Sequence, residues 1–81
     1  MIKPSIHLNG TSAGALFDGY VKAMLAVDAA IEKLAQASPH GRDYYPQGDD
    51  AFDKARAEHT ARIHALRGVA GELRDLAEHC S

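Results

Sequence analysis

The sequence predicts a mainly α-helical fold, an antiparallel two-helix hairpin with a short N-terminal β-strand. Two long stretches place apolar residues three and four positions apart, which is the repeat of a helix with one buried face. Between them lie eleven residues, 38 to 48, that include two prolines and two glycines. All 81 residues are expected to form a single domain, residues 1 to 81.

The composition is that of a folded protein with a small core. Hydrophobic residues make up 46% of the chain, charged residues make up 25%, and the formal net charge is -2. A chain with this composition is too apolar and too weakly charged to be intrinsically disordered. Because so short a chain buries only about 60% of the surface that its unfolded form exposes, we expect several copies to associate into a homo-oligomer.

Several classes of partner and location are disfavoured. An isoelectric point near 6.2 leaves no basic excess to neutralise the phosphates of duplex nucleic acid. The single cysteine, Cys80, cannot form an intrachain disulfide, which fits a reducing compartment. No apolar run approaches the length of a membrane span, and the first ten residues lack the apolar segment of an export signal. We expect a cytoplasmic protein without a membrane partner.

The first predicted element is a strand over residues 4 to 8. Ile6 and Leu8 alternate with Ser5 and His7, so that apolar and polar side chains fall on opposite faces. No second strand-like run follows with which it could form a hairpin. Either the segment lies as an extended arm over the helices, or it pairs with the same strand of another subunit, and we favour the second alternative.

A first helix is predicted over residues 12 to 37. Thr11 or Ser12 is expected to cap it with a hydroxyl, and Pro39 requires it to end shortly before. Its apolar residues recur at spacings of 3, 4, 3, 4 and 3 and form a coiled-coil-like seam. The seam consists of Phe17, Tyr20, Met24, Val27, Ile31 and Leu34, and Leu16, Val21 and Leu25 widen it.

A second helix is predicted over residues 50 to 79, capped by Asp49 or Asp50. Its apolar stripe contains Phe52, Ala55, Ile63, Leu66, Val69 or Ala70, Leu73, Leu76 or Ala77, and Cys80. His59 fills a gap in this stripe, and we interpret it as a buried or interface histidine rather than as a ligand or a base. Gly68 and Gly71 disfavour a helix, so we expect another backbone to approach closely there.

Charged residues line the outer faces of both helices. Pairs four positions apart are expected at Asp18 and Lys22, Asp50 and Lys54, Lys54 and Glu58, Glu58 and Arg62, and Arg74 and Glu78. A basic stripe on the second helix contains Arg56, Thr60, His64, Arg67 and Arg74. The stripe either binds a phosphate or forms a solvated face at the rim of an oligomer, and we favour the second alternative.

The segment between the helices is the best candidate for a binding site. It is longer than a helix-to-helix turn requires, and it carries Tyr44 and Tyr45 beside Arg42 and His40. Two adjacent tyrosines cannot both point into one small core. Either the exposed ring and the basic side chains bind a planar or anionic ligand or a protein, or one tyrosine only plugs the open end of the hairpin.

Catalytic and metal-binding patterns are not found. Asp75 and His79 are four positions apart, but the adjacent Cys80 points in another direction, so no metal site is expected. No serine or cysteine lies in a recognisable nucleophile pattern, and the glycines do not form a phosphate-binding loop. We expect a protein that is not an enzyme and has no cofactor.

Three segments resemble a known group of proteins. Residues 6 to 12 read IHLNGTS, residues 41 to 48 read GRDYYPQG, and residues 58 to 62 read EHTAR. Together they are similar to small uncharacterised proteins encoded by bacteriophages and prophages of proteobacteria. The resemblance implies a virus and host setting, with counter-defence and virion or packaging roles as its usual functions, and it implies no catalytic residues.

The functional hypothesis is sequestration of a small nucleotide-like ligand in pockets between subunits, in the cytoplasm of the host cell. Backbone amides of a turn would bind phosphate, and aromatic and basic side chains would stack and neutralise charge. The predicted ligand-binding residues are Asn9, Gly10, Thr11, Arg42, Tyr44 and Tyr45. Two alternatives are an inhibitor that binds a host defence protein through the same loop, and a virion or packaging accessory protein.

Overall fold

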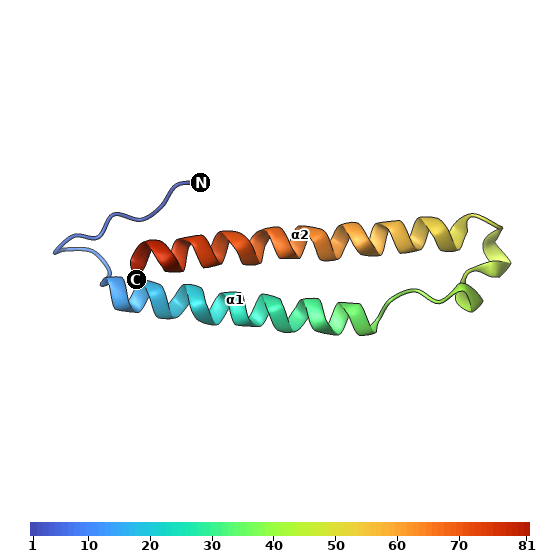
Figure 1. The fold of residues 1–81 in the computed structure, drawn as a ribbon, viewed down its shortest axis with the longest axis horizontal. Coiled ribbons are helices and arrows are strands. Elements are labelled where there is room, and N and C mark those ends of the chain that lie inside the picture. The colour runs from blue at the N-terminus through green and yellow to red at the C-terminus, as the bar shows by residue number, and fades with distance from the viewer.

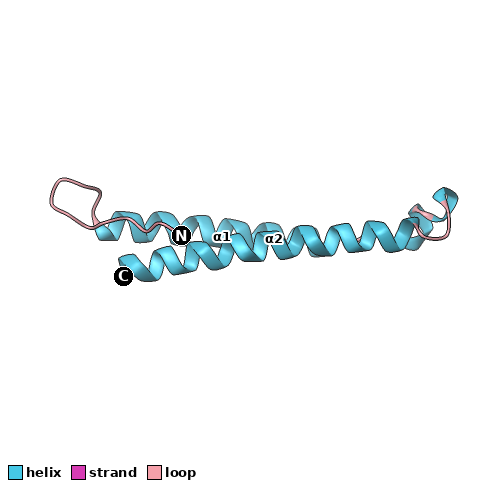
Figure 2. Ribbon diagram, turned by 90° about the horizontal axis from the view of Figure 1, so that it is seen from above, coloured by secondary structure: helices cyan, strands magenta, loops and turns pink.

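The structure is a computed structural model that describes all residues from 1 to 81. Two long helices, α1 (Ala13–Gln36) and α2 (Ala51–Cys80), lie side by side and run in opposite directions (Figure 1). The molecule is a rod of 61 × 20 × 15 Å, and the view from above shows how little of it extends beyond the two helices (Figure 2). The predicted helical hairpin is confirmed.

Helix α1 begins and ends at defined polar contacts. The Ser12 hydroxyl oxygen accepts a hydrogen bond from the Ala15 amide at 3.1 Å, so Ser12 rather than Thr11 is the cap. At the other end, the Ala37 amide donates to the carbonyl oxygens of Lys33 and Leu34. All six residues of the predicted seam are partly buried against α2. Leu25, which was expected to widen the seam, is instead 58% exposed.

Helix α2 follows Asp50, but the Asp50 side chain makes no capping hydrogen bond. Its carboxylate pairs with Lys54 at 2.9 Å instead. The predicted stripe faces α1, with Ala70 in the seam and Val69 exposed beside it. No helix of the protein combines the length and the apolar character of a membrane span.

Very little of the molecule is buried. Only Ala77, Cys80 and His59 are largely buried, and the remaining seam residues keep more of their surface in water. The reason is geometric, because two cylinders in contact cover only one face of each other. The hairpin therefore has a seam rather than a closed core.

The predicted strand over residues 4 to 8 is wrong, because the structure contains no strand. A strand needs a neighbour for its backbone groups, and this chain offers none. The segment is an extended arm that runs back along the C-terminal end of α2 (Figure 1). His79 holds it there, since its Nε2 donates to the Pro4 carbonyl oxygen at 2.8 Å. Neither of the alternating apolar side chains, Ile6 and Leu8, is buried, and Leu8 is 98% exposed.

Two smaller expectations are not met within the chain. Apart from the surrounding turns of α2, no atom lies within 4 Å of the position that a Cβ would take at Gly68, and the nearest one at Gly71 belongs to the flexible Arg74 side chain, so no other backbone segment of this chain approaches either glycine. Of the predicted surface ion pairs only Asp50 to Lys54 forms, and the second pair in the structure joins Asp53 to Arg56. Exposed pairs of this kind contribute little, and side-chain entropy opposes them.

The capping assignment leads to a first prediction. Replacing Ser12→Ala removes the acceptor for the Ala15 amide and should lower the free energy of unfolding by about 1 kcal/mol. Thr11→Ala is the matched control, because the neighbouring hydroxyl caps nothing and its loss should change stability by less than about 0.5 kcal/mol. Urea unfolding followed by circular dichroism measures both values. Equal losses in the two variants would show that the cap is assigned to the wrong residue.

Candidate functional site at the loop end of the hairpin

The connection between the helices is a folded segment of the chain. It contains two short 3-10 helices, η1 (Gly41–Asp43) and η2 (Tyr45–Gln47), and lies at the end of the rod opposite the termini (Figure 1). Gly48 turns the chain toward α2 with a φ of +119°, a conformation that other residues rarely adopt. Along the rod, the first turn of α2 lies beyond the last turn of α1. The connection therefore continues past the end of α1 and folds back to reach the start of α2 (Figure 1).

The two adjacent tyrosines point in different directions. Tyr44 is partly buried, and its ring lies 6.4 Å from the ring of Phe52 at an angle of 35°. Tyr45 is 78% exposed. The prediction that they could not share one core is confirmed, and Tyr44 is the residue that closes the open end of the hairpin against α2.

His59 links α2 to the end of α1. The residue is only 8% exposed, and its Nε2 lies 2.7 Å from the carbonyl oxygen of Leu34, 25 residues away in the chain. Leu34 is in the last turn of α1, where its carbonyl oxygen accepts from the Ala37 amide at 3.0 Å and has room for a second donor. His59 therefore caps the C-terminal end of α1 from the neighbouring helix. The interpretation of His59 as a buried histidine is confirmed.

The hydrogen bonds of His59 also define its tautomer. A carbonyl oxygen only accepts, so Nε2 carries the hydrogen and Nδ1 of the neutral ring is an acceptor. The Arg62 guanidinium lies one turn further along α2 and contacts Nδ1 through Nη1 at 3.4 Å. Both ring nitrogens are thus occupied, and Arg62 is oriented beside the ring while most of its N–H groups stay free.

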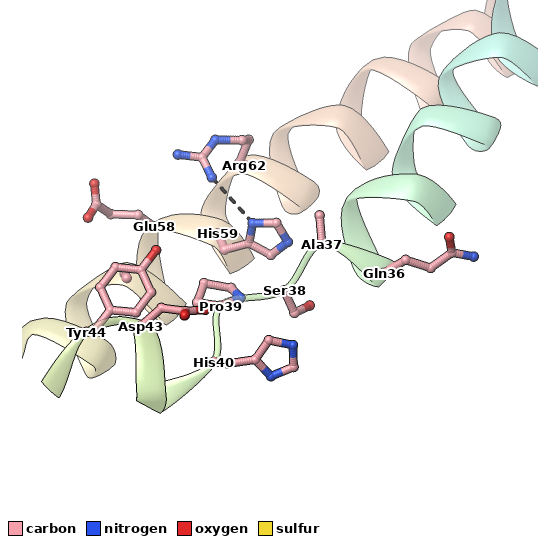
Figure 3. Close-up of a pocket in the computed structure, with 11 residues that line it drawn as sticks. Gln36, Ala37, Ser38, Pro39, His40, Asp43, Tyr44, Glu58, His59 and Arg62 are labelled. Carbon is pink, nitrogen blue, oxygen red and sulfur yellow. Dashed lines mark hydrogen bonds between the residues drawn. The ribbon is translucent and has the colours of Figure 1, made fainter.

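A hollow of about 670 Å³ lies where α1 ends and the connection begins. This volume is in the range of small-molecule sites. Figure 3 shows the Tyr44 ring, Arg62 and the His59 ring around one side of the hollow and the chain from Ser38 to His40 around the other. The eleven lining residues are Gln36, Ala37, Ser38, Pro39, His40, Asp43, Tyr44, Ala55, Glu58, His59 and Arg62.

The hollow is polar and carries both signs of charge. Arg62 and His40 offer hydrogen-bond donors, and Asp43 and Glu58 offer carboxylates. The Ser38 hydroxyl is already used, since it donates to the Ala35 carbonyl oxygen at 2.7 Å. No three side chains among the histidine, cysteine and acidic residues converge as metal ligands would. The arrangement suits a ligand that has an anionic group near Arg62 and hydrogen-bond donors near the carboxylates.

The structure separates the six predicted ligand-binding residues. Tyr44 alone lines the hollow, whereas Arg42 and Tyr45 lie beside it on the same loop. Asn9, Gly10 and Thr11 precede α1 at the other end of a rod that is 61 Å long. One subunit therefore cannot bring the two groups to one small ligand.

Of the residues that line the hollow, Glu58 and Arg62 had another role in the sequence analysis. Both are assigned from the sequence to a row of surface ion pairs, and the pairs expected of these two residues do not form. A signal was present in the spacing, because Arg62 lies three positions after the histidine in the apolar stripe and therefore beside it on α2.

The basic stripe on the other side of α2 borders smaller hollows. Arg56 lies with its guanidinium 5.3 Å from the centre of the Phe52 ring and contacts Asp53 at 3.4 Å, so this side chain is already engaged. Thr60 and His64 line two hollows of about 470 and 290 Å³, and Arg67 lines the smaller one. The loop-end hollow is therefore the better candidate for a binding site.

Comparison of the chain with protein-family models, with characterised proteins and with solved structures finds no match in any of the three. Function is therefore inferred from the chain's own residues and their arrangement.

The cap that His59 provides leads to a second prediction. His59→Leu keeps an apolar side chain in the seam but leaves the Leu34 carbonyl with the Ala37 amide as its only donor, and should lower the free energy of unfolding by about 0.5 to 1.5 kcal/mol. His59→Gln should lose less, because an amide nitrogen is able to reach the same oxygen. Chemical denaturation at matched protein concentration measures these differences.

His64→Leu is the control for this experiment, since His64 lies on the exposed side of the same helix. Its effect should stay within about 0.5 kcal/mol. If His59→Leu were as stable as His64→Leu, the link between the helices would contribute nothing to the fold.

Proposed function

We propose that the protein is a non-enzymatic binding protein that sequesters a small anionic, nucleotide-like ligand at the loop end of the hairpin, as part of a homo-oligomer. The observation that supports this most is that Arg62 and the Tyr44 ring line the same hollow of about 670 Å³. A guanidinium is suited to bind phosphate through several N–H groups at once, and an aromatic ring is suited to stack on a planar base.

The position of Arg62 supports an anion-binding role. Its contact with His59 Nδ1 restrains the side chain at the edge of the hollow before any ligand arrives. A restrained donor loses less conformational entropy on binding than a free surface arginine does. Asp43 and Glu58 line the same hollow and would repel a bare phosphate, so the proposal requires a ligand with donor groups as well, such as the amino groups of a nucleobase.

The hydrogen bonds at the site favour binding over catalysis. General base catalysis needs a ring nitrogen or carboxylate within reach of the proton to be removed. Both nitrogens of His59 are engaged, and the Ser38 hydroxyl donates to its own helix. These hydrogen bonds support a role for His59 and Ser38 in shaping the hollow rather than in proton transfer.

The biological setting of the proposal is counter-defence by a phage or prophage. It follows from the resemblance of the IHLNGTS and GRDYYPQG segments to small phage proteins. A small protein that removes a signalling nucleotide from solution needs no catalysis and acts in proportion to its own concentration. Such a protein would work in the cytoplasm of the infected cell.

A thermal-shift screen with cyclic and linear nucleotides tests the proposal. A ligand that binds only the folded protein should raise the melting temperature by about 5 °C or more when present well above its dissociation constant. The variant Arg62→Gln should abolish that shift. Arg67→Gln, an exposed arginine of the same helix that does not line the hollow, should retain it. A flat response of the unmodified protein across the whole panel would refute the proposal.

A second candidate function is inhibition of a host protein by direct binding. It is favoured by the exposure of Tyr45, which is 78% and lies outside the hollow, next to a helical turn that carries Arg42. Exposed tyrosine and arginine side chains are frequent in the centres of protein interfaces. Tyr45→Ala would abolish binding to such a partner and leave a nucleotide-induced thermal shift unchanged, which separates the two candidates.

A further inference from the structure

One long side of the hairpin carries a row of small apolar residues, and we call it the alanine face. Positions about 100° from the seam on one flank of α1 and the corresponding flank of α2 lie on the same side of an antiparallel pair. The alanine face consists of Gly19, Ala26 and Ala30 on α1 and Ala65 and Val69 on α2, all of them exposed, and Glu58 and Glu72 lie in the same row of α2. No atom of the chain lies within 4 Å of a Cβ built on Gly19. The surface is therefore flat enough for another backbone to approach.

The chain exposes more surface than its mass accounts for. Its accessible surface is 5931 Å², whereas a compact monomer of 8.7 kDa exposes about 4,700 Å². The excess of about 1,200 Å² is larger than the roughly 800 Å² that each partner buries in a stable protein interface. A subunit of a dimer that is separated from its partner exposes an apolar face and has excess surface of this kind.

We propose that a second copy of this chain packs on the alanine face, with the two hairpins stacked and their loop ends together. The result is a four-helix bundle in which α1 of each copy lies on α2 of the other. The inference builds on the homo-oligomer of the proposed function but does not depend on the ligand.

The charges beside the alanine face select this orientation. The hydrogen bond between His59 and Leu34 fixes the axial register of the hairpin, and antiparallel helices advance equally in opposite directions. Lys33 is therefore within about two residues of the level of Glu58, and Lys22 within about one residue of the level of Glu72.

With the loop ends together, each lysine of α1 meets a glutamate of the other copy's α2 at its own level. None of these four side chains forms an ion pair within the chain. A head-to-tail stack would instead lay α1 on α1 and α2 on α2, so that lysines would face lysines and glutamates would face glutamates.

The stacked orientation has a consequence for the loop-end hollow. Glu58 and Arg62 lie on the flank of α2 that borders the alanine face, so the hollows of both copies open toward the same end of the bundle. Lys33 of the other copy then lies beside Glu58 and offsets its negative charge. Pairing in this way makes each hollow more favourable for an anionic ligand than it is in one chain alone.

Sedimentation without any ligand tests the interface. The unmodified protein should sediment as a dimer, and Ala30→Arg should convert it to a monomer, because a long charged side chain cannot fit between the stacked helices. Ala29→Arg is the matched control, since the neighbouring alanine is equally exposed but points away from the alanine face. Circular dichroism should show that both variants remain helical. A monomeric unmodified protein, or equal behaviour of the two variants, overturns the proposal.

The ion pairs and the orientation are tested separately. Lys22→Glu should raise the dimer dissociation constant about fivefold, and adding Glu72→Lys in the same chain should restore it. Dyes attached at Tyr45→Cys in a Cys80→Ala background should show efficient energy transfer between copies. In a head-to-tail stack the dyes would be separated by most of the 61 Å length, and absent transfer in a dimer would overturn the orientation.

These outcomes are distinct from those of the nucleotide screen. A dimer that binds no nucleotide would retain the interface and refute the proposed function. A monomer whose melting temperature rises with a nucleotide would refute the interface and the homo-oligomer, and would retain the ligand of the proposed function.

Discussion

The hydrogen bond between His59 and the Leu34 carbonyl is the constraint on which the rest of the hairpin depends. A seam of partly buried aliphatic side chains holds two helices together but tolerates sliding along the axis, because one apolar contact can replace another. A directional hydrogen bond of 2.7 Å at a buried position does not tolerate such sliding. It sets which residue of α1 lies opposite which residue of α2, and so it also sets the levels of the charged residues beside the alanine face.

The same bond produces the loop-end hollow. α1 stops at this histidine while α2 continues, so the chain must leave α1 at the side and fold through η1 and η2 to reach the start of α2 (Figure 1). The Tyr44 ring packs on Phe52 and closes the far side of the loop, and Arg62 contacts the second nitrogen of the histidine. The residues that end one helix are therefore the residues that surround the candidate site.

Much of the fold could be predicted from the sequence because it depends on local periodicity. The seam from Phe17 to Leu34 and the position of Ser12 before α1 are short-range signals, and both are confirmed. The strand over residues 4 to 8 could not be judged in this way, since a strand is defined by a partner that may be distant or absent. Alternation at Ile6 and Leu8 only indicates a possible face, and nothing in the chain covers it.

The candidate site was less predictable for the same reason. Tyr44 was identified because it is an unusual residue in a long connection, but its separation from Asn9 by the length of the rod follows only from the three-dimensional arrangement. Arg62 was overlooked because surface charge pairs four residues apart are common in helices and their formation cannot be judged from spacing alone. Its role depends on what His59 contacts across the hairpin.

The tautomer of His59 is the most direct test of this account, and two-dimensional nitrogen-15 spectra that connect ring nitrogens to ring protons measure it. The account predicts a single neutral tautomer with hydrogen on Nε2, a slowly exchanging Nε2 proton, and nuclear Overhauser contacts from that proton to the last turn of α1. A ring that exchanges rapidly between tautomers, with no contact to α1, would contradict the claim that this histidine fixes the register of the two helices.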